Sequence, residues 1–122
     1  METHMRIEPD NKYCGYPCSM VGTGTAYEYI TGNNFNFESP EGIYDDGYLP
    51  LENENRYIRK YLKVKKRQYF KRNERFPLSK FLQDYKGAAC VCVYGHFLFA
   101  DNGDYYSFFD NDDDPVVCIW FL

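Results

Sequence analysis

Cys14 is the residue of this sequence from which covalent chemistry is most expected. It opens the stretch Cys-Gly-Tyr-Pro-Cys, which covers residues 14–18, and Pro17 suits the first turn of a helix because no backbone N–H is needed there. The positive end of a helix lowers the pKa of a thiol and so favours the nucleophilic thiolate. The sequence therefore predicts a nucleophile at Cys14, although an ordinary half-buried cysteine is the simpler alternative.

His96 is the candidate general base. The only other histidine, His4, lies in the polar N-terminal stretch. His96 begins an expected strand, and the next expected strand ends near Asp110. Because a hairpin sets the start of one strand beside the end of the next, we expect Asp110 to orient His96 for Cys14. Asp112 is the alternative carboxylate if the strand register shifts, and a purely structural histidine remains the alternative to a catalytic one.

The elements that must position these residues follow from hydrophobic spacing and turn residues. Helical spacing and proline positions predict helices from the region of Cys14, over Leu51–Lys63 and after Pro77. Gly22 and Gly24 predict that the first helix ends near Thr23. Strand patterns are found at Val64–Arg72, Ala88–Tyr94, His96–Ala100, Tyr105–Phe109 and Val116–Phe121. An Asn102-Gly103 hairpin turn separates the third and fourth of these.

These elements predict a single α+β domain over residues 1–122, in which a helix carrying Cys14 packs on a C-terminal antiparallel sheet. Residues 1–10 are expected to form a flexible tail. The composition supports a packed core, because aromatic residues make up 20% of the chain. The stretch Asn33–Tyr48, rich in Gly, Asn, Asp and Pro, is expected to form a long loop that serves as a lid or substrate rim.

Three parts of the sequence resemble the papain-like cysteine peptidases, in particular small members from phages and bacteria. The nucleophile stretch is similar to their Cys-Gly-x-x opening, and Thr23–Tyr27 matches a Thr-Gly-x-x-Tyr that follows it. Residues 95–110 are similar to their His strand, Asp-Gly turn and closing aromatic-Asp. The resemblance implies a papain-like fold with the site order Cys14, His96 and Asp110. It also implies an oxyanion donor just before the cysteine, where the nearest amide is Asn11 instead of the Gln of larger family members.

This resemblance implies a thiol hydrolase that cleaves a peptide or isopeptide bond in a protein or peptide substrate, without a cofactor. The alternative is a catalytically weak or inactive phage or mobile-element protein that uses the same fold to bind a host or virion protein. The implied location is the cytoplasm of a bacterial host or the virion.

Two other kinds of site are less favoured by the sequence. Cys14, Cys18, Cys90, Cys92 and His96 could ligate zinc, but Cys90 and Cys92 lie in an apolar strand where they are expected to share one buried face. A calcium site in the acidic run Asp110–Asp114 lacks the spacing of an EF-hand loop. No metal site is therefore predicted.

The charges are strongly segregated along the chain. Ten of the 14 Lys and Arg residues lie between Arg56 and Arg75, where aromatic residues are interleaved with them. A polyanion-binding module is therefore the third functional hypothesis, although a solvated face is commoner and nucleic acid is not the favoured partner. No apolar stretch approaches the length that spans a membrane, so no membrane association is expected.

Overall fold

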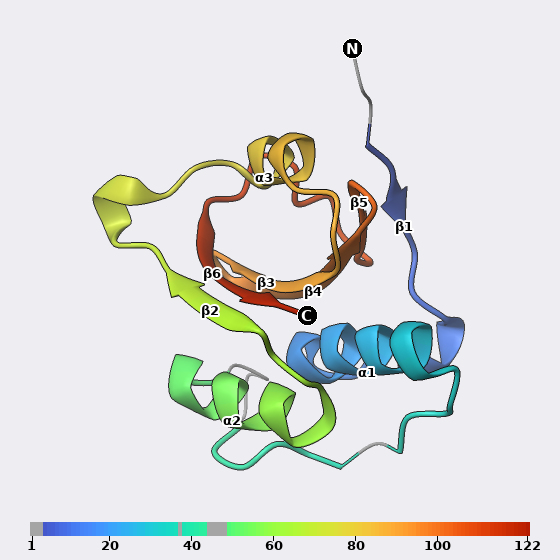
Figure 1. The fold of residues 1–122 in the computed structure, drawn as a ribbon. Coiled ribbons are helices and arrows are strands. Elements are labelled where there is room, and N and C mark those ends of the chain that lie inside the picture. The colour runs from blue at the N-terminus through green and yellow to red at the C-terminus, as the bar shows by residue number, and fades with distance from the viewer. Residues whose placement is uncertain (1–3, 37, 44–48) are drawn as a thin grey trace.

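The computed structural model describes residues 4–36, 38–43 and 49–122, and these form a six-stranded sheet with helices on both faces (Figure 1). The strand order is β1-β5-β4-β3-β6-β2. β1 pairs with β5 in parallel, whereas the other neighbouring strands are antiparallel. The strands are β1 Arg6–Ile7, β2 Lys66–Tyr69, β3 Ala89–Val93, β4 His96–Asp101, β5 Asp104–Tyr106 and β6 Val116–Phe121.

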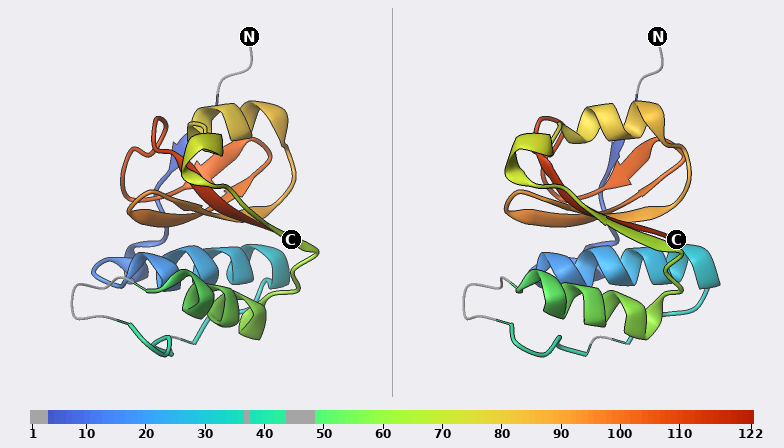
Figure 2. Two further views of the ribbon diagram at one scale, coloured as in Figure 1. Left: turned by 90° about the vertical axis from the view of Figure 1, so that its left-hand side faces the viewer. Right: turned by 60° about the vertical axis from the view of Figure 1, so that its left-hand side comes forward.

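Helices α1 (Cys18–Thr31) and α2 (Leu51–Tyr61) cover one face of the sheet, and α3 (Leu78–Asp84) lies on the other face (Figure 2). Two short 3-10 turns, η1 (Asn11–Tyr13) and η2 (Arg72–Glu74), precede α1 and α3. The sheet curves around α3, while α1 runs below β3 and β4 beside α2 (Figure 1). The fold class is therefore α+β, as predicted.

Strand β3 divides the core between the two faces of the sheet. Val91 and Val93 are buried in the cluster that contains α3, whereas Cys90 is buried in the cluster that contains residues of α1 and α2. Cys92 packs against this second cluster as well. The prediction that Cys90 and Cys92 share one face of a strand is therefore confirmed, and that face looks toward α1 and α2.

The expected elements are confirmed for most of the second half of the chain. Observed β6 has the predicted bounds, and β3, β4, α2 and α3 lie within a few residues of theirs. The Asn-Gly turn between β4 and β5 is also present, since Asn102 and Gly103 both have positive φ angles, of 54° and 81°. Strand β5 is shorter than expected and ends at Tyr106, which changes the residues that reach His96.

The prediction for the first helix is wrong at both ends. Helix α1 begins at Cys18, after Pro17 in an extended conformation, and continues to Thr31 through Gly22 and Gly24. Its glycines are sites of close packing: a Cβ on Gly22 would overlap the Phe97 ring on β4. Tertiary packing thus outweighs the low helix propensity of glycine.

Replacing Gly22 by alanine is expected to destabilise the protein by about 1–3 kcal/mol, because the added methyl group must displace Phe97 or the helix. Urea unfolding measures this loss. Ile30→Ala on the exposed end of the same helix is the matched control, and it is expected to change the free energy of unfolding by less than about 0.5 kcal/mol. An equally small effect for both variants would contradict the close packing of α1 on β4.

The N-terminal segment is more ordered than the sequence suggests. Arg6 and Ile7 extend the sheet as β1, and the Met5 N–H donates to Asp104 Oδ1 at 2.8 Å. The expected flexible tail therefore does not reach residue 10. Backbone pairing with β5 gives this polar segment an order that its side chains do not signal.

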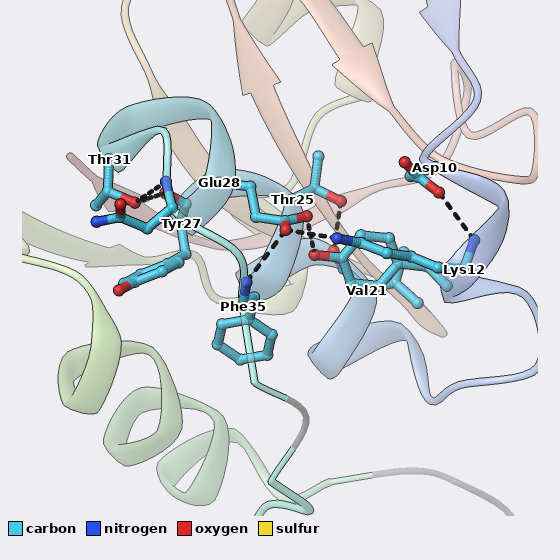
Figure 3. Close-up of polar contacts among 10 residues, drawn as sticks. Asp10, Lys12, Val21, Thr25, Tyr27, Glu28, Thr31 and Phe35 are labelled. Atoms are coloured by element: carbon cyan, nitrogen blue, oxygen red, sulfur yellow. Dashed lines mark hydrogen bonds and ion pairs between the residues drawn. The ribbon is translucent and has the colours of Figure 1, made fainter.

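Glu28 of α1 joins the segments on either side of its helix (Figure 3). Its carboxylate accepts hydrogen bonds from the Tyr13 hydroxyl at 2.6 Å and from the Phe35 backbone N–H at 3.1 Å. It also forms an ion pair with Lys12 at 2.5 Å. These contacts hold η1 and the start of the loop after α1 against the helix. They therefore position the segment that leads into Cys18.

Candidate active site

Cys18 lies at the start of α1 and lines two cavities together with His96. One cavity, of about 150 Å³, is also lined by Ser19, Glu54 and Cys92. The other, of about 130 Å³, is flanked by aromatic residues of the β5 region. Helix α1 therefore presents a thiol, and β4 an imidazole, to the same hollow part of the surface.

The environment of Cys18 acts on its pKa in two directions. Burial raises the pKa of the thiol, and the charge of Glu54 raises it further. The backbone N–H groups of Phe97, Ser19 and Cys18 itself lie close enough to the sulfur to oppose this increase. The thiol is therefore protonated at neutral pH, but hydrogen-bond donors already surround the position where its negative charge would develop.

His96 is held by a chain of three polar side chains. Its Nε2 atom lies 3.0 Å from Ser107 Oγ, the Ser107 hydroxyl donates to Asn111 Oδ1 at 2.6 Å, and Asn111 Nδ2 donates to Asp114 Oδ2 at 2.7 Å. Ser107 and Asn111 are both buried. The chain therefore links the imidazole to a carboxylate through groups that solvent does not reach.

This chain determines the tautomer of His96. The Asp114 carboxylate can only accept, so the Asn111 amide must donate to it and must use its oxygen to accept from Ser107. The single proton of the Ser107 hydroxyl is then committed to Asn111, and Ser107 Oγ can only accept from His96 Nε2–H. Nδ1 is left with its lone pair free to take a proton.

Burial lowers the pKa of His96, although the negative charge of Asp114 partly opposes this effect. The imidazole is therefore neutral at pH 7, which is the state that a general base needs. The two cavities are therefore lined by a protonated Cys18 thiol and a neutral His96 imidazole.

Cys14, the predicted nucleophile, lies outside this arrangement. It is exposed, and it is not among the described residues that line either cavity. Its thiol points to Asn11 Oδ1 at 3.3 Å, so the expected oxyanion donor presents an acceptor oxygen to this sulfur. The role of both residues stays a prediction, but the helix that was expected to activate Cys14 begins four residues later, at Cys18.

Asp110, the predicted orienting carboxylate, makes other contacts. Its Oδ1 accepts from the Asp112 backbone N–H at 3.0 Å and from the Tyr105 hydroxyl at 3.5 Å. Asp112, the alternative carboxylate, accepts from Tyr105 at 2.7 Å and lies 3.0 Å from His4 Nε2. The residues in contact with the His96 imidazole come from the segment after β5, which ends at Tyr106: Ser107 is its hydrogen-bond partner, and the Phe109 ring packs edge-on against it with the ring centroids 5.5 Å apart.

Glu54 is a functional candidate that sequence reasoning missed. It belongs to α2, is only 6% exposed and lines the larger cavity. Burial raises the pKa of this carboxyl to about 8, although a hydrogen bond with Cys92 partly opposes the increase. The amphipathic spacing of α2 was a usable signal, because Glu54 lies four residues before Ile58, on the apolar face.

The other expected sites are only partly visible. Residue 37 and residues 44–48 of the predicted lid loop lie outside the described residues, but Leu49 just after it lines the larger cavity. Nine of the ten basic residues between Arg56 and Arg75 are exposed, Arg75 being half-buried. Among the described residues, no group of three or more His, Cys, Asp or Glu side chains is placed to hold a metal ion. No helix in the described part of the chain is long and apolar enough to cross a membrane.

Comparison of this chain with models of protein families, with curated proteins and with solved structures finds no match. The site must therefore be interpreted from its own chemistry.

Proposed function

We propose that this domain is a papain-like thiol hydrolase that cleaves a peptide or isopeptide bond, with Cys18 as the nucleophile instead of Cys14. The observation that carries this proposal is the shared position of Cys18 and His96 at the same two cavities. The resemblance noted in the sequence places a nucleophilic cysteine at the start of an early helix, and in this chain that helix starts at Cys18.

In this mechanism Nδ1 of His96 takes the proton of the Cys18 thiol as the sulfur attacks the carbonyl carbon. The tetrahedral intermediate collapses when His96 returns that proton to the leaving amine, and the acyl group stays on Cys18 as a thioester. Water, deprotonated by His96, then hydrolyses the thioester and frees the thiol. Ser107 keeps the imidazole in the required tautomer and orientation throughout.

The start of α1 supplies donors for the oxyanion. The first backbone N–H groups of a helix have no intrahelical acceptor, and no side chain caps this end of α1. The N–H groups of Cys18 and Ser19 are therefore available to a negatively charged oxygen, and the helix dipole adds to their effect. These donors replace the amide of Asn11 that the sequence suggested.

Acyl transfer from p-nitrophenyl acetate tests the proposal without knowledge of the natural substrate. We expect a burst of about one equivalent of p-nitrophenol and, after peptide mass spectrometry, an acetyl group on Cys18. The same experiment with His96→Ala is expected to lose the burst.

Acetylation of Cys14 in place of Cys18 would restore Cys14 as the nucleophile and would contradict the proposed site. Absence of acetyl-cysteine altogether would instead favour the non-catalytic binding protein.

A further inference from the structure

The larger cavity beside Cys18 has one acidic group among apolar walls. Its volume is about 150 Å³, which leaves room for a chain of several heavy atoms. Four aliphatic residues contribute to its lining: Leu49, Leu51, Val93 and Val117. Glu54 is the carboxyl that lines the same space. Apolar walls with a single carboxyl are complementary to an alkyl chain that ends in a cation.

Glu54 has no cationic partner in the described part of the chain. None of the described Lys, Arg or His side chains forms an ion pair with it. The residues outside the described part of the chain include no Lys, Arg or His. A carboxyl that is buried without a cation is costly to ionise. A ligand that brings its own positive charge would offset this cost. We therefore expect the cavity to bind a cationic ligand more tightly than a neutral one of the same shape.

The wall of the cavity also holds a buried hydroxyl group. Ser19 is 2% exposed, lines the cavity, and its hydroxyl oxygen has no hydrogen-bond partner among the described residues. An ammonium group carries three N–H donors, so it can donate to Glu54 and, if the buried Ser19 hydroxyl turns toward the cavity, to Ser19 Oγ as well. Glu54 and Ser19 come from different helices, α2 and α1.

We propose that this cavity binds the primary ammonium group of an unbranched side chain, such as that of lysine, next to the bond that is cleaved. The inference rests on the proposed function for the position of the bond, but binding of the cation itself requires no catalysis. It assigns to the hydrolase a substrate with a basic residue beside the scissile bond, and to Glu54 the role of specificity determinant.

The other titratable groups at the cavity are Cys18, Cys92 and His96. Burial and the charge of Glu54 raise the pKa of the nearby Cys90 thiol. Burial also raises the pKa of Cys118, where the charge of Arg67 opposes the increase and that of Glu54 adds to it. Among the described residues that line the cavity, none carries a positive charge at alkaline pH, since burial lowers the pKa of His96, and Arg67 is paired with Glu52. A preference for cations at pH 8.5 is therefore attributable to Glu54, whose pKa of about 8 leaves it largely ionised there.

The test compares two thiol reagents of similar reactivity, cationic 2-aminoethyl methanethiosulfonate and neutral methyl methanethiosulfonate, on the intact protein at pH 8.5. Peptide mass spectrometry gives the rate at each cysteine, and exposed Cys14 serves as the internal control. We expect the cationic-to-neutral rate ratio to be about tenfold higher at Cys18 than at Cys14. The ratio cancels the thiolate fraction, so it does not depend on activation of Cys18.

In Glu54→Gln the cationic-to-neutral rate ratio at Cys18 is expected to fall to the value at Cys14. Glu52→Gln, which removes an exposed charge from the same helix, is expected to leave it unchanged. Equal ratios at the two cysteines in wild type, an unchanged ratio in Glu54→Gln, or no reaction at Cys18 with either reagent would each overturn the proposal. The two proposals fail separately, because the thiol reagents need no catalysis: absence of acetyl-cysteine with a cation preference at Cys18 would contradict the hydrolase alone.

Discussion

Cys18→Ala is expected to lose acyl transfer by at least about a thousandfold, while Cys14→Ala retains most of the wild-type rate. The two thiols differ in position: Cys18 shares two cavities with His96, whereas Cys14 is exposed and faces Asn11. Removal of a nucleophile removes the covalent intermediate, whereas removal of an exposed thiol outside the site leaves the intermediate intact. The burst amplitude with p-nitrophenyl acetate measures the difference.

The comparison of burst amplitudes requires that both variants are folded. Cys14→Ala serves as the matched control because it makes the same chemical change four residues earlier. Urea unfolding of the two variants checks that neither loses the native fold. Loss of the burst in Cys14→Ala, with retention in Cys18→Ala, would reverse the assignment and would return the nucleophile to the position that the sequence first indicates.

Glu54→Gln is expected to raise the stability of the protein increasingly with pH. The folded-state pKa of Glu54, about 8, lies above its ordinary value of 4.5 because the carboxyl is buried. The folded state therefore binds a proton that the unfolded state releases between these values, and the wild type loses stability as pH rises through this window. The loss is about 1.4 kcal/mol per pH unit and on the order of 5 kcal/mol in total.

The difference in free energy of unfolding between Glu54→Gln and wild type isolates this effect, since other acidic groups titrate equally in both proteins. Urea unfolding from pH 4 to pH 9 is expected to show a difference that grows up to pH 8 and is constant above it. Glu52→Gln is the control: its side chain is 63% exposed, so its difference should stay within about 1 kcal/mol at every pH. A constant difference for Glu54→Gln would mean that its carboxyl reaches water.

The loss of stability that we expect from Glu54 in the free protein would favour a role for this residue outside folding. A glutamine has the same size and would fill the same space, but it has no carboxyl group whose ionisation would cost stability. A buried acid with a raised pKa at a cavity is typical of sites that bind a ligand of opposite charge. The pH dependence of stability and the cation preference at Cys18 therefore test two consequences of one buried group.

Local sequence patterns were sufficient for much of the fold. The Asn102-Gly103 turn, the amphipathic spacing of α2 and the β-branched and aromatic strands predicted the order of elements and the α+β class. These features depend on neighbouring residues, because turn conformation and side-chain periodicity are properties of a few consecutive positions. The shared face of Cys90 and Cys92 followed from the same strand periodicity.

The composition of the site depended on contacts between distant segments. Gly22 permits α1 to continue because it fits against Phe97 of β4, and α1 then brings Cys18 to the same two cavities as His96. The end of β5 at Tyr106 sets Ser107, and not Asp110, against the imidazole. Burial of Glu54 likewise results from packing of α2 near α1 and β3. The sequence by itself determined which chemical groups were available and on which elements, whereas only the tertiary structure decided which of them meet, because helix extent and strand ends are set by packing across the sheet.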